Sequence, residues 1–139
     1  MKKVVVLGGG FGGAFTALGV AKGLQAGEAE VKLIARENYL FFTPFCTEIV
    51  GGAMEVRHAT APLREILGGC ASFLEASVEK IDLDARRVET SAGPVEYDLL
   101  VIALGSATGT FGLPGIRENT YFMRTLPEAI AFRNRVIDC

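Results

Sequence analysis

The spacing of apolar residues divides the first part of the chain into three regular elements. Residues 4–7 (VVVL) form a continuous apolar run before a glycine, which is typical of a strand buried on both faces of a parallel sheet. From Gly12 to about Ala26, apolar residues recur at helical spacing, and Gly27 is a helix stop signal. Residues 31–35 (VKLIA) predict a second strand. A strand, a glycine turn, a helix and a strand within about 35 residues predict a βαβ unit.

The pattern is weaker after this unit. Residues 38–52 are apolar without a clear period and contain Pro44, so they predict a structured loop with a short helix at 47–50. Residues 61–67 (APLREIL) predict a second short helix, with a proline in its first turn.

Regular structure returns in the second half. Between residues 73 and 97, apolar residues stand among charged ones with two turn-like breaks, which predicts an antiparallel meander with one solvated face. Residues 99–104 (LLVIAL) predict another fully buried strand, and TLPE at 125–128 is a capping box that opens a helix. We therefore expect one α/β domain over residues 1–139, with a Rossmann-like parallel sheet, helices and an antiparallel β-meander insertion.

Composition narrows the functional classes. The chain has 139 residues, half of them hydrophobic, and 14 basic against 16 acidic side chains, which gives no support for a nucleic-acid surface. The cysteines Cys46, Cys70 and Cys139 lie far apart, so no zinc or dithiol motif is expected, and reduced thiols indicate a cytoplasmic setting. No stretch approaches the roughly 20 apolar residues of a spanning helix, so any membrane contact is expected to be peripheral or to be made by something outside this chain.

The glycines after the first strand have the spacing of a dinucleotide-binding turn. Gly8, Gly10 and Gly13 form G-x-G-x-x-G between a predicted strand and a predicted helix, which is the context that this motif needs. The first glycine permits a tight turn, the second permits close approach of a pyrophosphate, and the third permits the helix to pack on the strand. The helix N-terminus then offers N–H groups and a partial positive charge to the phosphates. A ligand-free strand–helix turn is the alternative.

The end of the second predicted strand lacks the acidic residue that usually binds the ribose. Ala35 occupies that place. Two alternatives remain: Glu37 reaches the ribose from two residues further on, or Arg36 faces a 2′-phosphate and favours NADP. A third alternative is that both are solvated loop charges.

Cys46 lies in the apolar loop after Pro44 and has two interpretations. It is a redox nucleophile if its pKa is lowered, or a small buried hydrophobic residue. His58, beside Arg57, has no metal-ligating neighbours in sequence, and we expect no metal site.

Six stretches, in order along the chain, carry a family resemblance. They are VVVLGGGFGG at 4–13, NYLFFTP at 38–44, RHATAPLREIL at 57–67, YDLLVIALGS at 97–106, FGLPG at 111–115 and TLPEAI at 125–130. With them the chain resembles the N-terminal part of type II NADH:quinone oxidoreductases, within the two-dinucleotide-fold flavoproteins. The first and fourth stretches are shared by the whole superfamily, whereas NYLFFTP and FGLPG favour the quinone-reducing branch.

The resemblance implies FAD as cofactor and assigns residues to each part of it. The pyrophosphate would be held by Gly8, Gly10, Phe11, Gly12 and Gly13. Arg36 or Glu37 would lie by the adenosine ribose, and the backbone of Val78 by the adenine. Thr43 and Pro44 would lie beside the isoalloxazine, and Ala103, Gly105 and Ser106 would close over the cofactor.

The resemblance also implies an activity and further segments. The family transfers hydride from NADH to FAD and passes electrons to a membrane quinone. An NADH-binding domain, a segment completing the FAD site and a membrane-associating region would lie outside these residues, so we expect an incomplete FAD/NAD(P)-binding domain with little activity alone. Its parent would associate peripherally with the inner face of the cell membrane. Apolar surface near Phe41, Phe42 and Phe45 would then promote self-association.

Two alternative functions stay open. One is a single-cysteine flavoprotein of the NADH oxidase, peroxidase or coenzyme A-disulfide reductase type, in which Cys46 would be the catalytic thiol. The other is a non-catalytic nucleotide-binding module.

Overall fold

The computed structural model describes residues 1–25 and 27–139. They form two compact units, residues 1–40 with 62–105 and residues 41–61 with 106–139. The first unit contains the predicted βαβ unit and the meander. The second contains the other short helices and the C-terminal helix.

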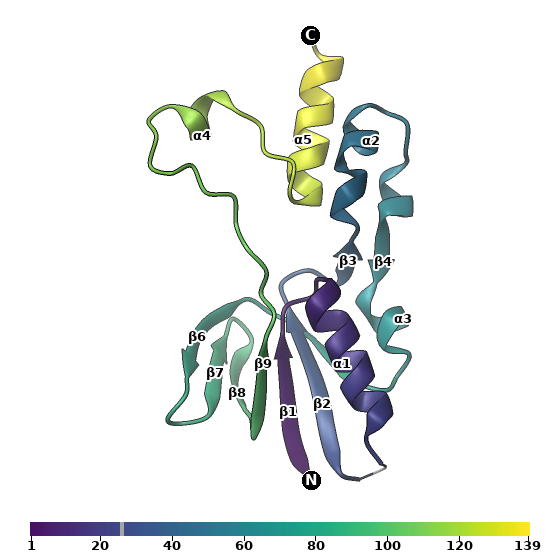
Figure 1. The fold of residues 1–139 in the computed structure, drawn as a ribbon, viewed down its shortest axis with the longest axis vertical. Helices are drawn as coiled ribbons and strands as arrows, with labels where there is room; N and C mark the ends of the chain where they lie inside the picture. Colours follow the sequence, from purple (N-terminus) through teal and green to yellow (C-terminus); the bar gives the residue numbers. More distant parts are fainter. Residues whose placement is uncertain (26) are drawn as a thin grey trace. The chain divides into compact units, whose positions relative to one another are not determined.

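A four-stranded parallel sheet organises the first unit (Figure 1). Its order is β5-β2-β1-β9. The strands are β1 (Lys2–Leu7), β2 (Ala29–Ala35), β5 (Ser72–Glu75) and β9 (Leu99–Ile102). Helices α1 (Phe11–Gly23) and α3 (Leu63–Leu67) also belong to this unit. The predicted parallel α/β sheet is confirmed.

The apolar residues of β1 contribute to two hydrophobic clusters, one on each face of the sheet. Val4 and Val6 join a cluster that includes Ala14 of α1, whereas Val5 and Leu7 join a cluster with Val88 of the meander. Successive residues of a strand point to opposite faces, and both faces of β1 are covered by these clusters. The four side chains of residues 4–7 are therefore all buried. The sequence VVVL is apolar at every position for this reason.

The meander is shorter than predicted. Antiparallel pairing joins β6 (Val78–Asp82), β7 (Arg87–Thr90) and β8 (Gly93–Glu96). Residues 73–75, expected within the meander, instead belong to β5, which pairs parallel with β2. Alternation of apolar and polar residues reports one buried face and carries no information on the direction of the neighbouring strand, so the expectation was wrong here.

The strand predicted at 99–104 is not fully buried. Among the described strands, β9 pairs with β1 alone and stands at the edge of the sheet, and Leu99 and Ile102 are 55% and 58% exposed. Its apolar composition is typical of a central strand, and only the order of strands in the sheet shows that β9 is an edge strand instead.

Two further boundaries differ from the prediction. The helix expected at 61–67 begins at Leu63, because residues 60–62 form strand β4 (Thr60–Pro62) beside β3 (Tyr39–Phe41), in a region expected to be loop. Helix α1 ends at Gly23, before the expected Ala26, which lies outside the described residues.

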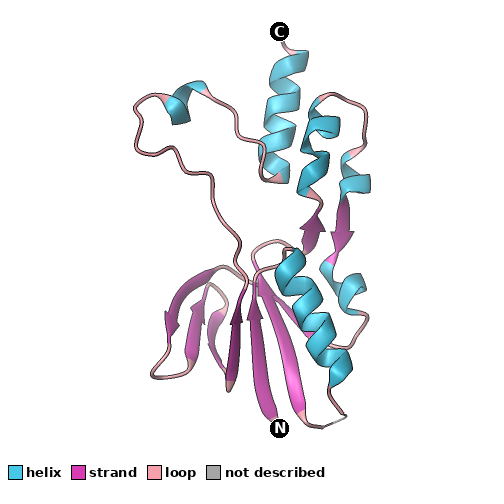
Figure 2. Cartoon of the chain, in the orientation of Figure 1, coloured by secondary structure: helices cyan, strands magenta, loops and turns pink. Residues whose placement is uncertain are grey.

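Two packed helices form the core of the second unit. The helices of this unit are η1 (Thr43–Phe45), α2 (Cys46–Val50), η2 (Val56–Ala59), α4 (Ile116–Asn119) and α5 (Leu126–Ile137). Cys46 and Ile49 of α2 pack with Ala129 of α5. Phe41 and Phe45 are partly buried against this core, so the surface expected around them is partly covered. The segment from Ala103 to Thr110 is without regular structure (Figure 2).

Candidate functional site

The turn between β1 and α1 is closed by contacts that admit only glycine. Gly8 has a φ of +109°, and its N–H donates to the carbonyl oxygen of Ile34 at 2.8 Å. A Cβ at Gly8 would stand 2.1 Å from the carbonyl oxygen of Ala103. The turn therefore lies directly against the backbone that leaves β9.

Gly13 packs the helix onto this turn. A Cβ there would stand 1.8 Å from the carbonyl oxygen of Gly8, a distance that no side chain tolerates. Gly12 lies beside the same wall, since a Cβ on it would come within 3.9 Å of the Ala103 side chain. The structure thus brings together four of the predicted residues: Gly8, Gly12, Gly13 and Ala103.

Gly10 differs from its neighbours because it faces open space. A Cβ at Gly10 would meet nothing within 4 Å, and its φ of −77° is open to any residue. Fold geometry therefore does not require glycine there. Gly10 is the N-cap of α1, and no side chain caps the helix. The first-turn N–H groups of a helix lack intrahelical acceptors, so this end is suited to bind an anion.

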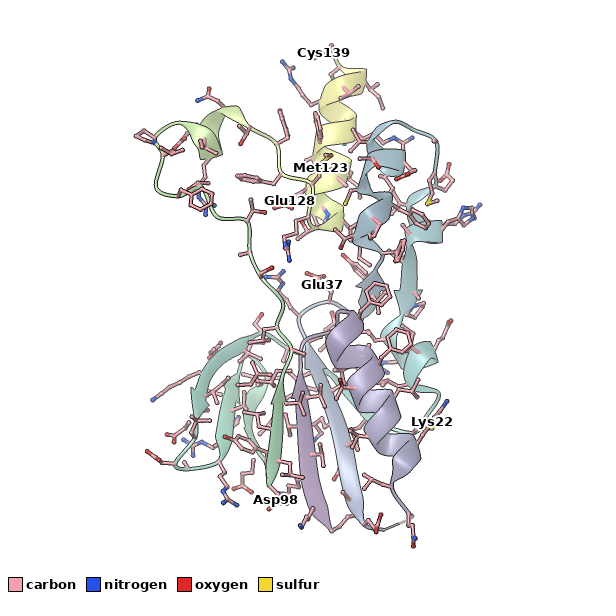
Figure 3. All side chains as sticks on the ribbon, in the orientation of Figure 1. Lys22, Glu37, Asp98, Met123, Glu128 and Cys139 are labelled. Atoms are coloured by element: carbon pink, nitrogen blue, oxygen red, sulfur yellow. The ribbon has the colours of Figure 1, made fainter. Side chains whose placement is uncertain are left out.

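The exposed end of β2 lies next to the same turn. Arg36 and Glu37 follow the strand, and the Arg36 Nε lies 3.2 Å from the Glu37 Oε1 (Figure 3 labels Glu37). A Cβ at Gly9 would come within 3.7 Å of the Glu37 carbonyl oxygen and 2.8 Å of the Ala35 Cβ. The ion pair offers a carboxylate and a guanidinium side by side, so the two alternatives for the ribose remain open.

Gly9 is a further glycine of the turn whose tight packing the spacing of the motif does not predict. Besides Ala35, its Cβ would meet the Leu63 Cδ1 at 2.8 Å, so α3 supports the turn from behind. The sequence signal for Gly9 is the run of three consecutive glycines at 8–10. The G-x-G-x-x-G motif requires glycine only at the first and last positions of this run, Gly8 and Gly10.

Gly105 and Val78 are the remaining predicted residues of the first unit. Ala103 N donates to the Leu7 carbonyl at 2.8 Å, and Gly105 has a φ of +75°, which allows the chain to turn away after β9. Val78 begins β6 and packs in the core beneath the meander.

Three predicted residues belong to the second unit. Thr43 and Pro44 lie in η1. The carbonyl oxygen of Ser106 accepts a hydrogen bond of 2.7 Å from the Arg124 Nε, and its hydroxyl accepts a second one from the same guanidinium.

The surroundings of Cys46 disfavour a thiolate. The side chain is buried in the α2–α5 core, and burial, together with the carboxylates of Glu128 and Glu48, raises the pKa of the thiol. A nucleophilic cysteine needs the opposite shift. These contacts favour the interpretation of Cys46 as a packing residue.

Neither a metal cluster nor a membrane-spanning helix occurs within residues 1–25 and 27–139. No group of three or more potential metal-ligating side chains was found among them. None of their helices has the length and apolar character that crossing a bilayer requires.

Curated sequences similar to this chain include proteins named as NAD(P)H- or NADH:quinone oxidoreductases. The external alternative NAD(P)H-ubiquinone oxidoreductase B1 of Solanum tuberosum mitochondria is 33% identical over 99% of the chain and 26% of its own length. The type II NADH:quinone oxidoreductase of Staphylococcus aureus is 35% identical over 86% of the chain and 30% of its own length. The chain thus spans between a quarter and a third of these relatives.

Solved structures agree in fold. The sulfide:quinone oxidoreductase of Aquifex aeolicus superposes with a TM-score of 0.88 at 32% identity, over 99% of this chain and 32% of the other. NDH2 of Plasmodium falciparum, solved with NADH, gives a TM-score of 0.85 at 27% identity, over 99% and 29%. The profile of the pyridine nucleotide-disulphide oxidoreductases matches residues 2–138. The chain therefore belongs to the pyridine nucleotide-disulphide oxidoreductase family.

Proposed function

We propose that this chain forms the FAD-binding part of an NAD(P)H:quinone oxidoreductase. The observation that carries the proposal is the contrast between Gly10 and its neighbours. Gly8, Gly9 and Gly13 are enclosed by protein, whereas Gly10 opens to solvent at an uncapped helix N-terminus. A glycine that the fold does not need, placed where a pyrophosphate would approach the backbone, fits the dinucleotide-binding turn.

The residues of the chain would then have distinct roles. The N–H groups of the first turn of α1, at Phe11, Gly12 and Gly13, would bind the pyrophosphate, while Gly8 fixes the turn against β9. Glu37 would accept from the adenosine ribose, or Arg36 would pair with a 2′-phosphate. Other parts of the chain would contact the rest of the cofactor. The backbone of Val78 would lie at the adenine, and Thr43 and Pro44 would lie at the isoalloxazine. Ala103, Gly105 and Ser106 would close over the cofactor.

The redox chemistry would come from the bound flavin, which accepts hydride from NADH and passes electrons to quinone. The protein positions this group and excludes competing reactions. The chain contains one G-x-G-x-x-G turn, so we assign NADH binding to a separate domain of the complete enzyme. Because quinones partition into membranes, the complete enzyme would work as a peripheral protein at the cytoplasmic membrane face. Relatives named as quinone oxidoreductases support this assignment.

The single-cysteine alternative has less support, because the raised pKa of Cys46 opposes a nucleophilic role. A non-catalytic nucleotide-binding module would share the glycine turn and would bind FAD without supporting turnover.

A matched pair of substitutions in one structural region tests the proposal. Gly10→Ala would place a methyl group where the pyrophosphate approaches, and crowding of this kind costs about 1–3 kcal/mol, or about a fivefold to 150-fold loss of FAD affinity. Gly19→Ala makes the same change on an exposed position of α1, also with nothing within 4 Å, and should leave affinity unchanged. Flavin fluorescence titration measures both, and mass spectrometry identifies the cofactor.

Two outcomes would contradict the proposal. One is a wild-type chain that binds no FAD. The other is equal FAD affinity in Gly10→Ala and Gly19→Ala.

A further inference from the structure

Ser106, in the irregular segment that follows β9, is held by one side chain. Residues 103–110 have no regular secondary structure, and residues 104–109 are exposed. Within the described part of the chain, the hydrogen bonds that hold residues 105–109 are the two donated by Arg124 to Ser106. One guanidinium engages both the carbonyl and the hydroxyl of the same serine, which fixes the orientation of that residue as well as its position.

Arg124 is itself held in place by the start of α5. The Glu128 carboxylate accepts from the backbone N–H of Arg124 at 3.0 Å and of Thr125 at 2.9 Å, and Glu128 N donates to the Thr125 Oγ1 at 3.4 Å (Figure 3 labels Glu128). This is a complete capping box, and it includes Arg124 as a third member.

The capping box rests in turn on the core of the second unit. Leu126 and Ala129, in the first turn of α5, pack with Cys46 and Ile49 of α2. A continuous set of contacts thus runs from a buried core, through the capped helix end and the guanidinium of Arg124, to Ser106. Ser106 is thereby held by a residue at the start of α5, 18 residues further along the chain.

We propose that Arg124 is a positioning residue for FAD binding, which acts by holding Ser106 and the segment after β9 in the cofactor-bound arrangement. This inference rests on the proposed function. Without the two hydrogen bonds the segment would sample many conformations, and FAD would bind only the fraction in which the segment is correctly placed. Apparent affinity falls in proportion to that fraction.

The expected effect is measured by FAD titration of the 139-residue chain. Arg124→Ala should weaken FAD binding by about fivefold to tenfold, because a small competent fraction reduces apparent affinity directly. Arg124→Lys should recover only part of this, since an ammonium group cannot reproduce the two-pronged contact. Millimolar guanidinium ion should restore affinity to Arg124→Ala and leave the wild type unchanged.

Arg135→Ala is the matched control. Arg135 is an exposed arginine in the last turn of the same helix, and the described residues include no side-chain hydrogen bond to it. Its loss should leave FAD affinity unchanged. Circular dichroism spectra and thermal unfolding of all variants separate an effect on affinity from a general loss of structure. We expect Arg124→Ala to retain the wild-type circular dichroism spectrum.

A double-mutant cycle shows whether Arg124 acts through Ser106. Ser106→Ala removes the hydroxyl and should weaken binding less than Arg124→Ala, and the double variant should be no weaker than Arg124→Ala alone. Fully additive losses would mean that Arg124 contacts the cofactor independently, and wild-type affinity in Arg124→Ala would mean that it has no role; either result overturns the inference. A wild-type chain that binds no FAD would instead refute the proposed function itself.

Discussion

Gly13→Ala tests the closest contact in the glycine turn. An added Cβ would stand 1.8 Å from the Gly8 carbonyl oxygen and 2.9 Å from its carbon. Real Cβ contacts do not fall below 3.0 Å, so α1 and the turn must separate by about 1.2 Å. Both partners are backbone in a packed unit, and overpacking of this kind costs about 3 kcal/mol. Replacing glycine by alanine within a helix returns about 1 kcal/mol, so a net loss of about 2 kcal/mol is expected.

Gly19→Ala provides the control within the same helix. Nothing lies within 4 Å of its added Cβ, so the helix-propensity gain of about 0.5–1 kcal/mol should appear alone. The two variants should therefore differ in unfolding free energy by about 3 kcal/mol. With a urea dependence of about 1.5 kcal/mol per molar, their midpoints should differ by about 2 M.

Urea titration followed by far-UV circular dichroism measures this difference. The chain has no tryptophan, so the helix signal is the suitable probe. If Gly13→Ala unfolds at the same urea concentration as Gly19→Ala, or at a higher one, the packing of α1 on Gly8 is not as the structure describes it.

Two further predictions concern the second unit. Burial raises the pKa of Glu128, but hydrogen bonds from Thr125 and Arg124 outweigh it and leave the pKa below its ordinary value. Its stabilising effect is therefore complete above the ordinary glutamate pKa and is lost as pH falls through the lowered folded-state pKa. Glu128→Gln should cost about 0.5 kcal/mol at neutral pH and almost nothing in acid, by urea titration at both; a pH-independent difference would argue against the carboxylate. Thiol labelling of the native chain should modify the exposed Cys70 and Cys139 rapidly, and Cys46 only on unfolding, whereas rapid labelling of all three would contradict its burial and raised pKa.

The elements that the sequence predicted best are those whose type and position are specified by residues close together in the chain. The glycines after VVVL specify a strand, a turn and a helix in immediate succession, and β1, α1 and β2 follow. The capping box at Thr125 and Glu128 likewise specifies the start of α5, because both partners lie within one helical turn. Pairing partners are a different matter, since β5 and β9 depend on which strands lie beside them.

The candidate site divides in the same way. Gly8, Gly10 and Gly13 were identified from spacing, and the structure adds which of them the fold requires and which it leaves open. The link between Arg124 and Ser106 could not have been predicted, because no periodicity relates residues 18 positions apart in an irregular segment.

The exposed edge of β9 affects how molecules of this protein associate at high concentration. Among the described residues, no strand pairs with the outer edge of β9, where Leu99 and Ile102 are exposed and the sequence LLVI contains no proline or lysine. These are the features of a template onto which a strand from another molecule can add. The opposite edge is protected by the polar Ser72 and Glu75 of β5. Association of concentrated protein should therefore be directional, with growth starting at one edge of the sheet.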